Sequence, residues 1–151
     1  MRYNPYDKIN KRLCAVCGTE VYVDSIGNGD ECPNCGWINC ACYEEFPDRV
    51  MCPNLIPLNK AKKLYAEGKP FMPDFDDFIG GYNFYTEMEF TYKGIMYGLM
   101  GVENIGVEFF EIDTGKGDTF KDIDEFVQKA QINGKLVKDI WTEVENVNWL
   151  Q

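Results

Sequence analysis

Two pairs of cysteines place the strongest constraint on how this chain can fold. Cys14 and Cys17 are separated by two residues, as are Cys32 and Cys35, and fourteen residues lie between the pairs. Each CxxC turn can present two thiolates to one ion, so the two turns together complete a tetrahedral shell of four sulfurs. We therefore predict a metal site formed by Cys14, Cys17, Cys32 and Cys35, with a structural Zn²⁺ as the ion. Iron in a rubredoxin-like site is less favoured, because such sites use similar turns but usually a longer gap.

The residues around these cysteines favour a structural metal over a catalytic one. A glycine follows each pair, at Gly18 and Gly36, which suits a turn that needs a positive φ while its N–H groups point at the sulfurs. A catalytic zinc keeps one position open for water, usually with histidine among its ligands, and this chain contains no histidine. A redox role for the two pairs is less favoured, since one CxxC would suffice for that chemistry.

Three further cysteines remain outside the predicted shell: Cys40, Cys42 and Cys52. A second metal site built from them would need a carboxylate as its fourth ligand, from Glu44, Glu45 or Asp48. The favoured alternative is that all three are buried or half-exposed thiols that bind no metal. A nucleophilic role is less favoured again, because no histidine is present to activate a thiolate.

The apolar runs of the chain bear on its expected compartment. Its first residues, MRYNPYDKINKR, contain no apolar segment, and no apolar run approaches the roughly 20 residues that a membrane span requires. We therefore expect a cytoplasmic protein that does not enter a membrane. Thiols are kept reduced in the cytosol, so the cysteine cluster is expected to bind metal and not to form a disulfide framework.

The charge distribution divides the chain into two parts. Residues 1–69 carry nine acids and nine bases, whereas residues 70–151 carry sixteen acids and six lysines and so account for the whole net charge of −10. We predict a zinc-ribbon module over residues 1–69, a linker rich in Pro, Gly and acids over 70–81, and an acidic α+β domain over 82–151.

Periodicity predicts the elements of the acidic domain. Alternating apolar residues predict a strand over 82–92, followed by strands over 95–102 and 107–113. Helical spacing of apolar residues then predicts two amphipathic helices, over 118–132 and 136–144. The fold class is therefore α+β: an N-terminal zinc ribbon with a short helix, then a three-stranded antiparallel sheet packed against two C-terminal helices.

The N-terminal module resembles the cysteine-rich CPCC family of small bacterial and phage proteins, over about residues 10–69. The residues that match its two turns and the following helix are Cys14, Cys17, Cys32, Pro33, Cys35, Trp37, Asn54, Leu58, Ala61, Lys62 and Tyr65. Two segments depart from the family pattern, since Ala15-Val16 replaces its Pro-Cys and WINCAC replaces its usual WEDD. The resemblance implies a zinc ribbon with a packed helix, and it implies no activity.

These features favour a binding protein over an enzyme. We expect a non-enzymatic binding or adapter protein, in which the ribbon is a scaffold and the acidic domain engages a protein partner with a basic surface. An immunity protein, an inhibitor or a phage-type antagonist of a nucleic-acid enzyme would fit this description. Electrostatic steering would make such an association fast and sensitive to salt.

Two other functions are weaker candidates. A ribbon that binds nucleic acid is supported by a locally basic N-terminal arm, with Arg2, Lys8, Lys11 and Arg12. It is disfavoured because residues 1–69 are neutral overall and the acidic domain would repel phosphates. An enzyme would need an acid/base pair such as Glu87 and Glu89, but these lie two apart on the predicted strand and hence on one solvated face.

Overall fold

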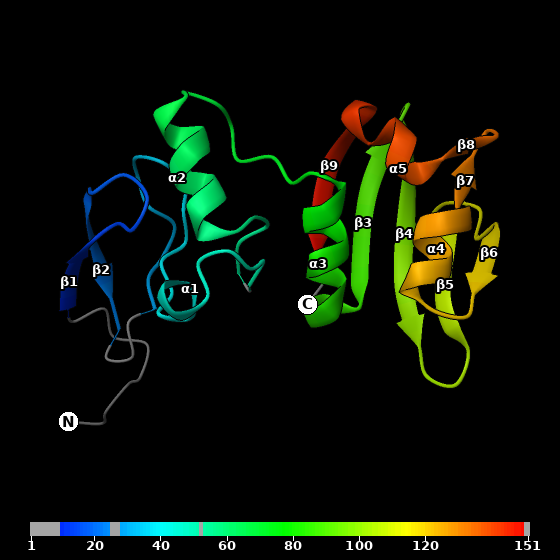
Figure 1. The fold of residues 1–151 in the computed structure, drawn as a ribbon, viewed down its shortest axis with the longest axis horizontal. Helices are drawn as coiled ribbons and strands as arrows, with labels where there is room; N and C mark the ends of the chain where they lie inside the picture. Colours follow the sequence, from blue (N-terminus) through cyan, green and yellow to red (C-terminus); the bar gives the residue numbers. More distant parts are fainter. Residues whose placement is uncertain (1–9, 25–27, 52, 150–151) are drawn as a thin grey trace. The chain divides into compact units, whose positions relative to one another are not determined.

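The structure of the chain is a computed structural model that describes residues 10–24, 28–51 and 53–149. The chain forms two compact units, Met1–Met72 and Pro73–Gln151 (Figure 1). Each unit has its own hydrophobic core. Among the described residues, no helix combines the length and the apolar character needed to cross a membrane.

The first unit contains short elements around a small core. The strands β1 (Asn10–Leu13) and β2 (Glu20–Val23) form an antiparallel hairpin, and the helices are α1 (Cys42–Glu45) and α2 (Leu58–Ala66). The helix α2 lies within the segment expected to be helical, and Gly68 follows it with a φ of 68°. Its buried residues Leu58 and Ala61 share a core with Trp37 and Tyr43.

The second unit contains one antiparallel sheet of five strands in the order β6-β5-β4-β3-β9. The strands are β3 (Glu87–Tyr92), β4 (Ile95–Val102), β5 (Gly106–Glu111), β6 (Gly117–Phe120) and β9 (Val144–Trp149). The other elements are α3 (Phe75–Tyr85), α4 (Ile123–Lys129), the hairpin β7 (Gln131–Ile132) and β8 (Lys135–Leu136), α5 (Val137–Ile140) and the 3₁₀ helix η1 (Trp141–Glu143). The helices α3, α4 and α5 lie on the same face of the sheet (Figure 1).

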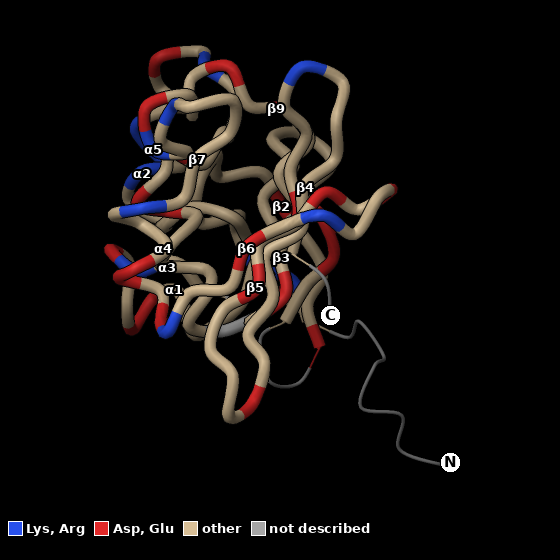
Figure 2. The backbone as a smooth tube through the Cα atoms, turned by 90° about the vertical axis from the view of Figure 1, so that its right-hand side faces the viewer, with Lys and Arg blue, Asp and Glu red and all other residues tan. Residues whose placement is uncertain are grey.

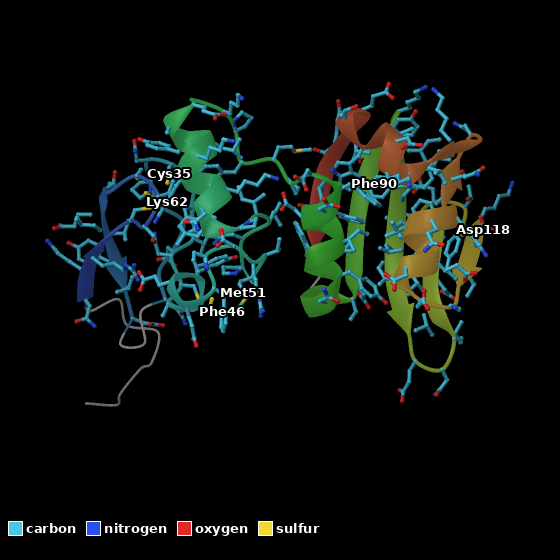
Figure 3. All side chains as sticks on the ribbon, viewed as in Figure 1. Cys35, Phe46, Met51, Lys62, Phe90 and Asp118 are labelled. Atoms are coloured by element: carbon cyan, nitrogen blue, oxygen red, sulfur yellow. The ribbon has the colours of Figure 1, made fainter. Side chains whose placement is uncertain are left out.

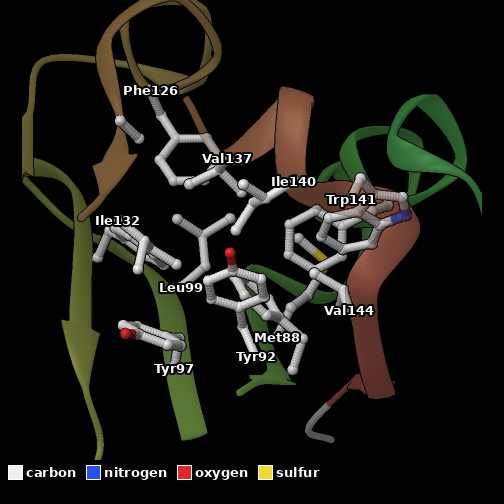
Figure 4. Packing of buried hydrophobic residues seen from close by; sticks show 14 of the residues in the cluster. Met88, Tyr92, Tyr97, Leu99, Phe126, Ile132, Val137, Ile140, Trp141 and Val144 are labelled. Atoms are coloured by element: carbon white, nitrogen blue, oxygen red, sulfur yellow. The ribbon is translucent and has the colours of Figure 1, made fainter. Parts of the chain in front are cut away.

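The core of this unit fills the space between the sheet and its helices (Figure 4). The strand predicted over 82–92 begins only at Glu87, because residues 82–85 belong to α3. Within β3, Met88, Phe90 and Tyr92 alternate and are buried, as the predicted period of two requires. Phe90 and Trp141 pack edge to face, with their ring centroids 5.3 Å apart. The indole N–H of Trp141 donates to the Pro73 carbonyl at 3.1 Å, which holds the start of the unit against its core.

The sheet is larger than predicted, because two strands join it at its edges. The predicted sheet had three strands, but β6 pairs with β5 and β9 pairs with β3. The predicted helix over 118–132 begins only at Ile123, since the side chain of Asp122 caps it by accepting from the Glu125 N–H at 2.8 Å. The predicted helix over 136–144 is short and leads into β9. Val137, Ile140 and Trp141 are buried in α5 and η1, as the predicted helical spacing requires, and only Val144 of the predicted helix belongs to β9.

A helix occupies most of the segment expected to be a linker. The Asp74 side chain accepts from the Asp77 N–H at 2.9 Å, and the Asp77 side chain accepts from the Asp74 N–H at 3.0 Å, which forms a capping box at the start of α3. Gly80 and Gly81 contributed to the prediction of a linker here, but Gly81 has a packing role within α3. A Cβ atom on Gly81 would lie 1.9 Å from the indole nitrogen of Trp149. The glycine therefore lets β9 approach α3 closely.

Replacing Gly81 with alanine tests this contact. With Trp149 present, the added methyl group overlaps the indole ring, and we expect the free energy of unfolding to fall by about 1–3 kcal/mol. In a Trp149→Ala background the overlap is absent, and the same change should raise the free energy of unfolding by up to about 1 kcal/mol, because alanine favours a helix. Urea unfolding of the four proteins measures both effects. An equal effect in the two backgrounds would contradict this packing.

Candidate metal centre and open sheet face

The first cysteine turn is the tip of the β1–β2 hairpin. Cys14 follows the last residue of β1, and its N–H donates to the Thr19 carbonyl at 2.7 Å. The Gly18 N–H donates to the Cys14 carbonyl at 2.9 Å, and Gly18 has a φ of 76°. A side chain at this position would be strained by the backbone conformation, so the predicted need for glycine is met here.

The second cysteine turn repeats the geometry of the first. The Cys32 N–H donates to the Trp37 carbonyl at 2.8 Å, and the Gly36 N–H donates to the Cys32 carbonyl at 2.9 Å. Gly36 has a φ of 81°, and an antiparallel bridge between Glu31 and Ile38 closes the base of the turn. The two segments that share the CxxCG pattern thus adopt the same turn, as the repeated pattern predicts.

The two turns bring all four predicted sulfurs together. The Sγ atoms of Cys14, Cys17, Cys32 and Cys35 all lie within 4.8 Å of one another. The Cys14 and Cys35 sulfurs are 3.7 Å apart, and the Cys17 and Cys32 sulfurs are 3.6 Å apart. A tetrahedral ion with metal–sulfur bonds of about 2.3 Å needs sulfurs about 3.8 Å apart. The cluster can therefore hold one metal ion in a closed shell of four thiolates.

The core of the first unit holds the cluster in place. Cys14 and Cys32 are buried with Leu58 and Ala61 of α2, and Cys35, labelled in Figure 3, packs against the same core. Trp37 follows the second turn directly and is 1% exposed. The sulfur cluster and the apolar core are thus one packed structure, in which loss of either exposes the other.

Two polar side chains favour ionisation of one thiol. Burial opposes ionisation of Cys17, but hydrogen bonds with Asn34 and Thr19 outweigh it and lower the pKa of Cys17 to about 6. Burial raises the pKa of Cys32 and of Cys35, and neighbouring thiols raise both further. Several thiolates at close range are therefore costly without a cation, and a bound metal ion would supply the compensating charge.

The polar residues that brace the two turns were not identified from the sequence. Asn39 is 1% exposed, and its side-chain oxygen accepts from the Ala15 N–H inside the first turn at 2.9 Å. Asn54 accepts from the Ile38 N–H at 3.0 Å and donates to the Ile38 carbonyl at 2.8 Å, which fixes the exit of the second turn. A buried asparagine has no periodic signature, so only the contacts reveal this role.

Cys40 and Cys42 do not belong to the four-sulfur cluster. Cys40 and Cys42 pack against the same core, and their Sγ atoms are 2.6 Å apart. Cys52 lies outside the described residues. Among the residues that the structure describes, the only group of three or more metal-binding side chains is the predicted set of four cysteines.

The two charged residues of β1 are paired within the first unit. Lys11 forms an ion pair with Glu20 at 2.9 Å, and Arg12 forms one with Glu44. Glu44 was one of the carboxylates considered for a second metal site, and in the structure this carboxylate pairs with the Arg12 guanidinium. Each cation already faces a carboxylate, which reduces the positive charge that β1 offers to a phosphate.

One face of the five-stranded sheet carries none of the unit's described helices; we call it the open sheet face. Its centre is apolar, formed by Met96, Met100, Phe110 and Ile112. Met96 is 41% and Ile112 is 37% exposed. A hollow of about 220 Å³ lies beside Met100, Phe110 and Ile112. A Cβ atom on Gly98 would lie 2.9 Å from the Phe110 ring, so the glycine provides the surface on which the ring rests.

Carboxylates surround the apolar centre of the open sheet face. They belong to Glu87, Glu89, Glu108 and Glu145, which the strand register places on this side. None of the five described strands contains a lysine or an arginine, and none of these four carboxylates forms an ion pair with a described residue. Figure 2 marks the acidic and basic positions along the backbone. The face therefore combines apolar contact area with unpaired negative charge.

Comparisons of the chain with known protein families, with curated proteins and with solved structures found no match. The four-cysteine cluster is compatible with a zinc-ribbon-like site. The resemblance to the CPCC family rests on the motif residues of the first unit alone. What the chain can bind is therefore inferred from the geometry of the sulfur cluster and of the open sheet face.

The pKa directions predict that metal affinity falls as the pH falls. The raised pKa values keep Cys32 and Cys35 protonated at neutral pH in the metal-free protein, so metal binding must release these protons. Each released proton makes the affinity rise about tenfold per pH unit, so Cys32 and Cys35 alone contribute about 100-fold per unit. Below about pH 6 the proton on Cys17 adds a further tenfold per unit. Competition with a chelator of known protonation measures this slope, and an affinity that is independent of pH would contradict the ligand set.

Proposed function

We propose that this protein is a non-enzymatic binding protein in which a structural Zn²⁺ stabilises the first unit and the open sheet face of the second unit engages a protein partner with a basic surface. The observation that carries the partner proposal is the chemistry of that face. Its exposed apolar centre resembles the core of a protein interface, where burial of apolar and aromatic side chains supplies affinity. Its ring of carboxylates would select a partner that carries lysine or arginine around an apolar patch.

The charge of the second unit supports the same proposal. All sixteen acids counted from residue 70 onward lie in Pro73–Gln151, with six lysines, so this unit carries the whole net charge of −10. Such a field attracts a basic protein over a distance and repels phosphate backbones. Immunity proteins, inhibitors and antagonists of nucleic-acid enzymes are the kinds of protein that meet a basic surface in this way.

The donor set supports zinc as the structural metal. Four thiolates at tetrahedral spacing leave no open position for water, so an ion held there would stabilise the fold without taking part in catalysis. The gap of fourteen residues between the two turns favours zinc over a rubredoxin-like iron site. Zinc binding contributes about 10–16 kcal/mol in small zinc-finger peptides, which would suffice to fold a unit of short elements.

Metal analysis of three proteins tests the zinc proposal. We expect one zinc ion per chain in natively purified wild-type protein and in Cys40→Ser, because Cys40 lies outside the cluster. Cys32→Ser should lose the ion and unfold or precipitate the first unit. Elemental analysis and thermal unfolding measure the two effects. Iron in place of zinc would contradict the choice of metal, and equal stability of Cys32→Ser and Cys40→Ser would contradict the four-cysteine ligand set.

Affinity capture tests the partner proposal. The bait is wild-type protein in a lysate of its source organism at low salt, followed by identification of the captured proteins by mass spectrometry. We expect a specific partner with a basic isoelectric point, which is released as the salt concentration rises. The triple variant Glu87→Gln, Glu89→Gln, Glu108→Gln should weaken binding of this partner about tenfold or more, chiefly by slowing association.

The control variant has the same charge change on another side of the unit. Asp124→Asn, Asp139→Asn and Glu143→Gln together alter three exposed acids of α4, α5 and η1, and this protein should bind the partner almost as well as the wild type. Equal loss of binding in both triple variants would indicate a net-charge effect and contradict a role for the open sheet face. Binding that is unaffected by either variant would contradict the proposal as a whole.

A further inference from the structure

A third cysteine motif, Cys40-Ala41-Cys42, forms a tight surface turn at the start of α1. The Tyr43 N–H donates to the Cys40 carbonyl at 3.2 Å, which closes the turn across the two cysteines. Cys40 and Cys42 are half-buried, and Ala41 between them is exposed. The turn therefore places two thiols side by side where a small molecule can reach them.

The spacing of these two sulfurs differs from that of metal ligands. The Sγ atoms of Cys40 and Cys42 are 2.6 Å apart. Sulfurs that share a tetrahedral ion lie about 3.8 Å apart, close to the 3.6 and 3.7 Å found in the four-sulfur cluster. The sulfurs of Cys40 and Cys42 are therefore closer than two ligands of one tetrahedral ion. The turn holds the two thiols in direct contact, where each can reach the other.

Buried residues on both sides hold the turn in this conformation. Asn39 and Tyr43 are each 1% exposed. The Asn39 side chain accepts from the Ala15 N–H at 2.9 Å. The Tyr43 hydroxyl donates to the carbonyl of Met51, which is labelled in Figure 3, and accepts from the Asn54 N–H at 2.8 Å. Since both flanks are anchored, little chain entropy is lost when the two sulfurs join.

We propose that Cys40 and Cys42 form a reversible disulfide by exchange with a small-molecule disulfide, as a redox site separate from the metal centre. One protein thiolate attacks a sulfur of the small disulfide, which forms a mixed disulfide and releases one small thiol. The second protein thiolate then attacks the protein sulfur of the mixed disulfide and releases the other small thiol. The cysteine pair loses two electrons and two protons, and the small disulfide gains both.

The chain itself supplies every protein group that this exchange requires. Thiol exchange proceeds from the thiolate present in solution and requires neither a histidine nor a bound cofactor. The four-sulfur cluster is a distinct set of cysteines, so oxidation of the pair leaves the metal ligands unchanged. One unit thus contains a pair of cysteines suited to redox exchange beside four suited to metal binding.

Incubation of the natively purified, metal-containing protein with oxidised glutathione tests the proposal. We expect the wild-type chain to lose two hydrogen atoms by mass, with peptide mapping showing a link between Cys40 and Cys42, and dithiothreitol to restore the original mass. The metal-to-chain ratio should not change. Cys52→Ser should form the same link, because Cys52 is outside the proposed pair.

Two single variants are the matched controls. In a Cys52→Ser background, Cys40→Ser and Cys42→Ser each lack the second thiol, so each should retain a stable adduct of one glutathione where the Cys52→Ser protein shows none. A link that involves Cys52, or a persistent glutathione adduct on the wild-type pair, would overturn the proposal. A second metal ion that is lost in the Cys40→Ser, Cys42→Ser double variant would also overturn it, in favour of a metal site.

Discussion

The convergence of four sulfurs is the interaction on which the first unit depends. Its described strands have four residues each, and its helices have four and nine, lengths at which isolated elements are not stable in water. Two of the sulfur-bearing residues, Cys14 and Cys32, are themselves part of the small core. A cation shared by the two turns would join segments far apart in the chain, and the position of α2 and of the core aromatic residues follows from that junction.

The same unit separates two kinds of thiol chemistry by backbone geometry. In the four-sulfur cluster, two CxxCG turns, each with a glycine of positive φ, bring sulfurs from different turns to the spacing of metal ligands. In Cys40-Ala41-Cys42, the two sulfurs come from one anchored turn and lie 2.6 Å apart. Sulfurs that converge from two turns suit a metal ion, whereas two sulfurs in contact within one turn suit exchange.

The second unit has a sheet that is covered by its own helices on one face. The buried side is a continuous aromatic and aliphatic core, and the open sheet face combines exposed apolar side chains with unpaired carboxylates. Glycine has a packing role on both sides, because Gly81 admits Trp149 against α3 and Gly98 supports the Phe110 ring. Part of the negative charge counted in the sequence therefore surrounds an apolar surface. For this reason we propose a partner that carries basic residues around an apolar patch.

The amino-acid sequence by itself determined the features that depend on local chemistry. The CxxCG spacing identified all four cysteines of the cluster, and the alternation in β3 identified its buried face, because turn geometry and strand period act over a few residues. Only the tertiary structure decided the rest. The residues after η1 form β9 because they pair with the edge of β3. Position 81 of α3 accommodates glycine because a side chain there would overlap the Trp149 indole. Strand pairing and close packing join residues that are distant in the chain, so no local pattern records them.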